Sequence, residues 1–242
     1  MSFRHLADQG PIAAWAIHAL TASGLVFALL AIEAVGRGDW RVALLWLLAA
    51  LVVDGIDGTL ARAARVDERL PRIDGAALDL IVDYLTYVFV PALLIWRAQM
   101  LPHEIALPLV ASILVSSLYV FARRDMKTDD GYFRGFPALW NIVAVYFVLT
   151  PLPPVLAAAI VTGLVLLTFS PIHVVHPFRV TARRPIAAGA AAIWVVSTTA
   201  LLIGVPAPFW WNIVLGFSLV SLAGLTLLGL IRTVRGPRTV AT

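Results

Sequence analysis

The stretch DGIDGTLARAARVDERLPRIDGAALDLIVD, residues 54–83, carries two pairs of aspartates separated by an arginine-rich connection. Asp54 and Asp57 are three residues apart, and Asp79 and Asp83 are four residues apart. On a helix, each of these spacings places both side chains on the same face. Apolar runs flank the stretch on both sides, so it predicts a helical hairpin across which two carboxylate pairs face one another.

The rest of the chain is too apolar for an ordinary soluble domain. Its 242 residues are 61% hydrophobic and 13% charged, and the mean hydropathy is +0.91. Apolar runs long enough to cross a hydrocarbon layer of roughly 30 Å recur along the sequence, with short connections. We therefore expect an all-α integral membrane protein, a single domain over residues 1–242. Its polytopic helical bundle should have about eight transmembrane helices, at 12–35, 41–62, 76–96, 104–121, 137–152, 154–170, 185–204 and 209–231.

Charge placement predicts how these spans cross the membrane. Lysine and arginine accumulate in cytoplasmic loops, and with eight spans one face receives 15 of the 18 basic residues. Both termini and the aspartate hairpin should then be cytoplasmic. These basic loops would lie against anionic membrane lipids, so we expect no nucleic-acid partner. The fifteen residues are Arg4, Arg62, Arg65, Arg69, Arg72, Arg123, Arg124, Lys127, Arg134, Arg179, Arg183, Arg184, Arg232, Arg235 and Arg238.

The four aspartates require a compensating charge, because a carboxylate inside a bilayer typically costs a few kcal/mol. Salt bridges to Arg62, Arg65, Arg69 or Arg72 would supply that charge without any chemistry. Clustered carboxylates are better matched by hard divalent cations, which take oxygen ligands and can bridge a pyrophosphate. The chain has no cysteine, which excludes disulfides and thiolate metal sites.

The hairpin resembles the signature of the CDP-alcohol phosphotransferase family, whose two elements are DxxDGxxAR and GxxxDxxxD. Residues 54–62 and 75–83 fill all eight fixed positions. Small residues at Gly58, Ala61 and Gly75 would let a helix or a nucleotide approach the backbone. The guanidinium of Arg62 can pair with phosphate as a planar bidentate donor.

The resemblance implies a role for each residue of the motif. Asp54, Asp57 and Asp79 would hold two divalent ions, Mg²⁺ or Mn²⁺, over the pyrophosphate of CDP-diacylglycerol. Asp83 would be a ligand of the second ion and the general base for the incoming hydroxyl. A homodimer is also implied. The residues expected to bind CDP-diacylglycerol are Gly58, Ala61, Arg62, Gly75 and Thr21, although packing would explain Thr21 equally well.

A longer insert narrows the resemblance to one branch of the family. Twelve residues, 63–74, separate the two motif elements, where eight is usual, and this is similar to the bacterial phosphatidylcholine synthases. Segments 18–24, 130–141 and 176–179 resemble that branch as well. The resemblance implies choline as the acceptor, with phosphatidylcholine and CMP as products, and a location in the bacterial inner membrane.

Choline carries a quaternary ammonium, which aromatic faces and carboxylates recognise. The candidate choline-binding residues are Tyr84, Tyr132, Phe133, Trp140, Asp130 and Asn141; interfacial anchoring or helix packing would account equally well for any single ring. His173 and His176 are expected in an interfacial turn rather than at a metal. Two other functions stay open, a sister transferase using glycerol 3-phosphate, inositol phosphate or serine, and an ion-coupled transporter.

Overall fold

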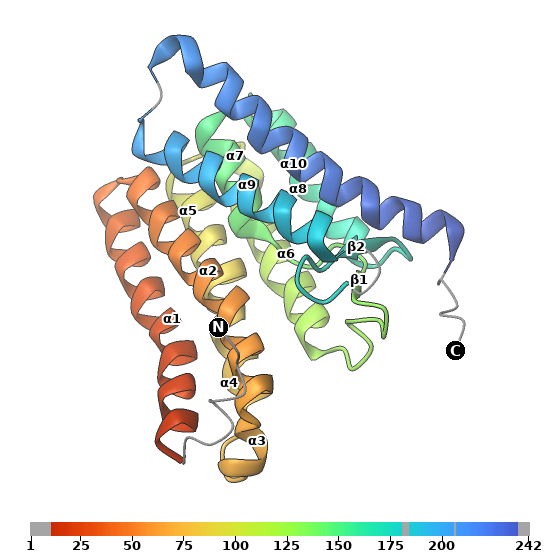
Figure 1. Cartoon of the computed structure of the whole chain (residues 1–242). Coiled ribbons are helices and arrows are strands. Elements are labelled where there is room, and N and C mark those ends of the chain that lie inside the picture. The colour runs from red at the N-terminus through yellow and green to blue at the C-terminus, as the bar shows by residue number, and fades with distance from the viewer. Residues whose placement is uncertain (1–10, 181–183, 206, 237–242) are drawn as a thin grey trace.

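The computed structural model describes residues 11–180, 184–205 and 207–236, and the chain folds into a bundle of helices with one small two-stranded antiparallel sheet (Figure 1). Arg4, Arg183 and Arg238 lie outside the described residues. The elements in chain order are α1 Pro11–Arg37, α2 Trp40–Ala64, α3 Val66–Arg69, α4 Gly75–Asp83, the π-helical turn η2 Tyr84–Phe89, α5 Val90–Arg97, α6 His103–Ala122, β1 Tyr132–Arg134, α7 Trp140–Leu149, α8 Pro154–Thr168, β2 His173–Val175, α9 Arg184–Ile203 and α10 Pro208–Arg235.

The expected all-α membrane architecture is confirmed, with a correction to the fifth and sixth spans. Six helices in the described ranges are long and apolar enough to cross a membrane. The other two, α7 and α8, have ten and fifteen residues, or about 15 and 22 Å of helix, less than the roughly 30 Å of hydrocarbon. Proline shortens α7, because Pro137 precedes it, Pro151 follows it, and the backbone at Ala138 is left-handed (φ 58°).

The third span is continuous from Gly75 to Arg97 and changes helix type midway. Its middle turn, η2, has π-helical geometry and ends at Phe89, two residues before Pro91. Proline has no N–H to donate to the preceding turn, and single π turns inside α-helices occur frequently at functional sites. The turn carries Tyr84 and Tyr87, directly after Asp83.

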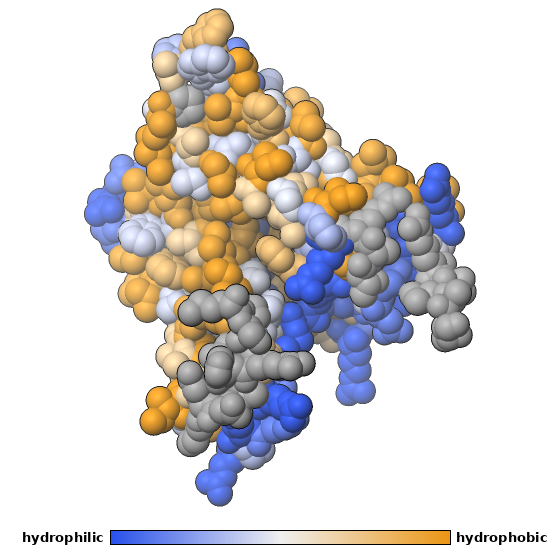
Figure 2. All heavy atoms as spheres, viewed as in Figure 1, coloured by the Kyte–Doolittle hydropathy of each residue, from blue (hydrophilic) through white to orange (hydrophobic). Residues whose placement is uncertain are grey.

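The helices run up and down, so that their connections gather at two ends (Figure 1). The α1–α2, α5–α6, α7–α8 and α9–α10 turns lie at one end. At the other end lie the α2–α4 connection, the two-stranded sheet and the C-terminal end of α10 (Figure 1). Figure 2 shows hydrophilic residues concentrated at this second end and apolar residues over most of the body. We call the second end the polar end.

Apolar side chains fill the interior and also cover the outside of the bundle. Trp140, Leu47 and Ile113 are almost completely buried, whereas Val115 and Val220 are about 70% exposed, at 69% and 72%. An apolar exterior is stable when lipid rather than water surrounds it. Some polar groups in the interior are paired with each other, as when the Trp140 indole N–H donates to Ser117 Oγ at 2.9 Å.

The two-stranded sheet is the one element type that the hydropathy pattern did not predict. β1 and β2 pair antiparallel, with Phe133 opposite Val174. Helix α10 lies against β2, and Gly229 permits the contact: a Cβ there would overlap the carbonyl oxygen of His173. The Thr233 hydroxyl accepts the His173 backbone N–H at 2.7 Å. The two-stranded sheet is thereby fixed to the last helix, α10.

Candidate functional site

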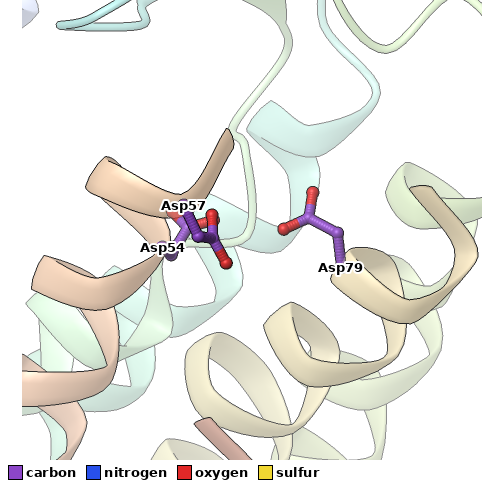
Figure 3. Close-up of side chains that lie close together, drawn as sticks. All are labelled: Asp54, Asp57 and Asp79. Atoms are coloured by element: carbon purple, nitrogen blue, oxygen red, sulfur yellow. The ribbon is translucent and has the colours of Figure 1, made fainter. Parts of the chain in front are cut away.

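Three aspartates form a compact group near the polar end. Asp54 and Asp57 project from α2 and Asp79 from α4, with their carboxylates turned into the space between the helices (Figure 3). One oxygen from each lies within 4.8 Å of the others. Asp57 is 3% exposed, and its Oδ1 has no hydrogen-bond partner in the described part of the chain. A buried carboxylate oxygen without a partner is costly, and an all-oxygen donor set suits a hard divalent cation. These residues therefore fit the expected metal.

Local signals place the two helices that carry this group. Helix α2 ends where Arg65 adopts a left-handed conformation (φ 48°). Helix α4 begins at Gly75, where the Asp74 side chain caps it by accepting the Ala77 N–H at 2.9 Å. The short helix α3 lies within the connection between them. The expected helical hairpin is thus formed, and Asp79 lies in the second turn of α4.

Asp83 is the last residue of α4, one turn beyond Asp79. It is not among the three grouped carboxylates, but its charge interacts with those of Asp54, Asp79 and Asp57. Tyr87 lies a further turn along, on the same face, and its hydroxyl donates a short hydrogen bond to Asp54 Oδ2. Tyr87 is not among the candidate site residues that the sequence pattern indicated. Its spacing of four from Asp83 was the available signal.

The residues expected to bind CDP-diacylglycerol lie around the aspartates. The Thr21 hydroxyl lies near Asp57 and donates to the Ile17 carbonyl at 3.3 Å, and the Arg62 charge interacts with Asp57 and Asp79. A Cβ added to Gly58 would meet only Arg62 Nη1, at 3.4 Å. A Cβ on Gly75 would lie 3.0 Å from His18 Cε1 of α1. Ala61 packs with the small apolar cluster Ala14, Ile17, Ala64 and Val66.

The candidate choline residues lie in separate environments, and three of them make internal contacts. Tyr84 is half-buried; its hydroxyl donates to the Leu114 carbonyl at 3.0 Å and its ring meets the edge of Phe121. Trp140 is fully buried. Asn141 is buried too, and its Oδ1 accepts the Ile142 N–H at 2.9 Å.

The other three, Asp130, Tyr132 and Phe133, lie in strand β1 or just before it. Asp130 forms an ion pair with Arg232 of α10 at 2.5 Å, and the same guanidinium lies over the Tyr132 ring, 5.8 Å from its centroid. Phe133 stacks on the His176 imidazole, with 5.2 Å between centroids and 13° between planes. Asp130 and Tyr132 thus contact α10, while Phe133 is grouped with His176.

Two cations near the aspartates were predicted only as loop residues. Lys127 lies between α6 and β1, and Arg179 follows β2. Burial and the charge of Arg179 lower the pKa of Lys127, while Asp79, Asp83 and Asp54 act in the opposite direction. Sequence spacing gave no signal for this, since Lys127 is more than forty residues from the nearest of these aspartates.

His176 lies among the same cations. Burial, and then the charges of Lys127, Arg179 and Arg62, lower its pKa to about 3, so the imidazole is neutral at physiological pH. Its Nδ1 accepts the Phe178 N–H at 3.4 Å. In the described ranges, the group that could hold a metal contains the three aspartates and neither His173 nor His176.

Comparisons with known proteins agree on one family. A family model described as CDP-alcohol phosphatidyltransferase matches residues 15–170. A phosphatidylcholine synthase of Pseudomonas aeruginosa is 48% identical over 194 residues, which cover 80% of this chain and 82% of the relative. Proteins of the same name from Bradyrhizobium diazoefficiens and Agrobacterium fabrum are 44% and 40% identical, covering 76% and 82% of this chain and 69% and 83% of the relatives.

Proposed function

Because this chain belongs to the CDP-alcohol phosphatidyltransferase family, we propose that it is a phosphatidylcholine synthase, which transfers the phosphatidyl group of CDP-diacylglycerol to choline and releases CMP. The observation that carries the proposal is the group of Asp54, Asp57 and Asp79, with carboxylate oxygens within 4.8 Å near the polar end of an apolar bundle. A lipid substrate with a charged diphosphate needs such a boundary. Its acyl chains can stay in the membrane while the diphosphate meets the carboxylates.

Asp54, Asp57, Asp79 and Asp83 would hold the divalent metal, Mg²⁺ or Mn²⁺, as two ions. When bound, the metal supplies positive charge that neutralises the diphosphate and the departing CMP. The family's dependence on a divalent metal and the carboxylate group support this assignment. The choice of ion and the number of ions are part of the proposal.

The chain's own residues bind and orient the reactants. Arg62 binds phosphate, and Gly58 and Gly75 leave room for the nucleotide beside α2 and α4. The choline oxygen attacks the phosphorus that carries the diacylglycerol, forming one P–O bond while the P–O bond to CMP breaks. An alcohol is a poor nucleophile at neutral pH, so Asp83 accepts its proton during the attack. The leaving group departs as CMP.

We further propose that choline is recognised by at least one ring among Tyr84, Tyr132, Phe133 and Trp140, aided by Asp130 or Asn141. Tyr84 is supported by its place next to Asp83. Phe133 is a less accessible candidate, because the Lys127 ammonium already lies 5.5 Å from its ring centroid and would repel a second cation. The protein would act as a homodimer in the bacterial inner membrane, with both termini and the site on the cytoplasmic side.

Purified protein supplied with CDP-diacylglycerol, Mg²⁺ or Mn²⁺ and one alcohol at a time tests the function. We expect phosphatidylcholine and CMP in equal amounts with choline, and neither after chelation of the metal. A lipid product formed instead from serine, glycerol 3-phosphate or inositol phosphate would replace the choline assignment by a sister transferase. Full turnover after chelation would overturn the metal assignment.

A further inference from the structure

Three cations converge on the aspartates without pairing to them. Lys127 interacts electrostatically with Asp79, Asp83 and Asp54, and Arg179 and Arg62 both interact with Asp79. In the part of the chain that the structure describes, the carboxylate ion pairs within 4.0 Å include none of these three cations. The cations and carboxylates therefore influence one another electrostatically without forming ion pairs within 4.0 Å in the described ranges.

The two-stranded sheet and the loops beside it hold two of the cations in place. The Lys127 backbone bridges to Phe133, and its ammonium lies over that ring. The His176 N–H donates to the Gly131 carbonyl at 3.1 Å, and the Arg179 N–H donates to the His176 carbonyl at 3.2 Å. Gly131 (φ 85°) lies against the Arg179 backbone, where a side chain would collide. The positions of Lys127 and Arg179 are thus set by one backbone framework.

Grouping these charges is unfavourable unless a polyanion binds there. The charges of Arg179 and Lys127 interact unfavourably, and Arg179 also repels Arg62. A half-buried ammonium next to other cations lacks the solvation that would offset this repulsion. Phosphate oxygens relieve it, since ammonium and guanidinium groups form charge-assisted hydrogen bonds with them. Choline, itself a cation, would be disfavoured among the three.

We propose that Lys127 and Arg179 are positioning residues that, with Arg62, bind the diphosphate of the nucleotide substrate against the aspartate group. The inference rests on the proposed function, because it takes CDP-diacylglycerol as the substrate. The carboxylates and their metal would contact one part of the diphosphate. Lys127 and Arg179 would contact another part. The neutral His176, stacked on Phe133, would support Lys127 without adding a fourth charge.

Lys127→Met and Arg179→Met test the inference, with Arg124→Met as the matched control. Arg124 is an exposed arginine in the same connection between α6 and β1. Binding of CDP to purified protein with Mn²⁺ present should weaken about 10- to 100-fold in Lys127→Met, which is the loss of a hydrogen bond between charged groups. Arg179→Met should weaken it several-fold, and Arg124→Met should leave it unchanged.

Mn²⁺ binding without nucleotide separates a positioning role from a structural one. Removing the Lys127 charge beside the carboxylates should leave Mn²⁺ affinity unchanged or increase it, whereas a collapsed site would lose Mn²⁺ and CDP together. The KM for CDP-diacylglycerol should rise while the choline KM stays within about twofold. If Lys127→Met does not fold, Lys127→Arg should keep CDP binding and Lys127→Gln should lose it.

Wild-type CDP affinity in both the Lys127 and Arg179 variants would overturn this inference. So would a rise confined to the choline KM, or equal losses of Mn²⁺ and CDP binding. If the unmodified protein makes phosphatidylcholine and these results are found, only the inference fails. If CDP binding depends on Lys127 while choline is not a substrate, the proposed function fails and the diphosphate site stands.

Discussion

At the scale of single residues, Asp57 differs from its neighbours because it is nearly inaccessible and one carboxylate oxygen has no hydrogen-bond partner in the described chain. Asp54 is instead oriented by the Tyr87 hydroxyl, and Asp83 lies one turn beyond Asp79. In the proposed function, Asp54, Asp57 and Asp79 hold the metal, and Asp83 also accepts a proton.

We predict that changing Asp54, Asp57, Asp79 or Asp83 to Asn removes turnover. An amide keeps the size of the side chain but loses its charge and one oxygen ligand, and loss of a general base alone costs about 10²- to 10⁴-fold in rate. Initial rates of phosphatidylcholine formation would measure this. Asp67→Asn and Glu68→Gln are the controls. Glu68 lies 3.9 Å from an exposed arginine, and such a surface pair has little energetic value. Equal losses in both sets would mean that the cluster is only an electrostatic scaffold.

Tyr87→Phe removes the hydroxyl that donates to Asp54 and keeps the ring that packs in the core. Partners that orient a metal ligand typically contribute 10- to 100-fold in metal affinity or activity, so we expect a loss of about that size in Mn²⁺ affinity. Mn²⁺ titration of the purified protein would measure it. Tyr146→Phe is a matched control, because that hydroxyl bonds to Ser218 and Trp194. Unchanged Mn²⁺ affinity in Tyr87→Phe would contradict the role.

For choline, replacing the contacting ring by Leu should raise the choline KM about two- to thirtyfold, because a cation–π contact contributes roughly 0.5–2 kcal/mol. Tyr84, Tyr132, Phe133 and Trp140 are to be changed one at a time. Steady-state kinetics would compare the choline KM with that for CDP-diacylglycerol, which should move much less. Trp140→Leu should also destabilise the fold, since that ring is fully buried. Normal choline kinetics in all four variants would remove the aromatic contact from the proposal.

At the scale of elements, the third span and the two-stranded sheet together organise the polar end. The span from Gly75 to Arg97 carries Asp79, Asp83 and, through the turn η2, Tyr87. The sheet carries Phe133, while Lys127 precedes β1 and Arg179 follows β2 in the chain. Five residues, 135–139, connect β1 to α7, and they include Pro137 and the left-handed Ala138 that delay the start of the helix.

Gly229→Ala should weaken the packing of the two-stranded sheet against α10. A Cβ at this position would overlap the His173 carbonyl oxygen and lie 3.0 Å from Val174 Cα, and overpacking typically costs about 1–3 kcal/mol. The thermal unfolding temperature in detergent should fall by several degrees. Gly224→Ala on the same helix meets nothing within 4 Å and should leave this temperature unchanged or raise it slightly. A fall of the same size in both variants would show that the contact with β2 is not the cause, because a change from Gly to Ala by itself favours the helix.

At the scale of the whole molecule, apolar side chains cover the body while charge is gathered at the polar end (Figure 2). The opposite end carries fewer basic residues, and one of them, Arg37, is paired with Glu33 at 2.7 Å and Asp39 at 3.2 Å. Lipid around the body would favour this separation. The side on which the polar end lies follows from the basic residues and remains a prediction.

The absence of cysteine makes this orientation directly measurable. Arg124 at the polar end and Arg97 at the opposite end are both exposed. A membrane-impermeant maleimide should label Arg97→Cys in intact bacterial spheroplasts, and Arg124→Cys only after the membrane is permeabilised, because basic loops resist translocation. The unmodified chain is the blank. The reverse labelling pattern would place the site outside the cell and contradict the proposed orientation.

The sequence by itself determined the membrane class, the main spans and the four aspartates. These follow from local rules. Lipid requires long apolar helices, and helical periodicity brings together residues three or four apart. Both can therefore be read without knowing how the helices pack. The resemblance to a family extended this to the motif residues Gly58, Ala61, Arg62 and Gly75, of which Gly58, Arg62 and Gly75 lie around the carboxylates.

Only the tertiary structure decided what lies opposite the motif. The Tyr87–Asp54 hydrogen bond joins residues 33 positions apart, and the Asp130–Arg232 ion pair joins residues 102 positions apart. The convergence of Lys127 and Arg179 on the aspartates is equally non-local, as is the pairing of β1 with β2, which α7 and α8 separate in the chain. Such contacts depend on which helices are neighbours and at what depth each one ends. Hydropathy and spacing along the chain contain neither quantity, because each describes one segment at a time.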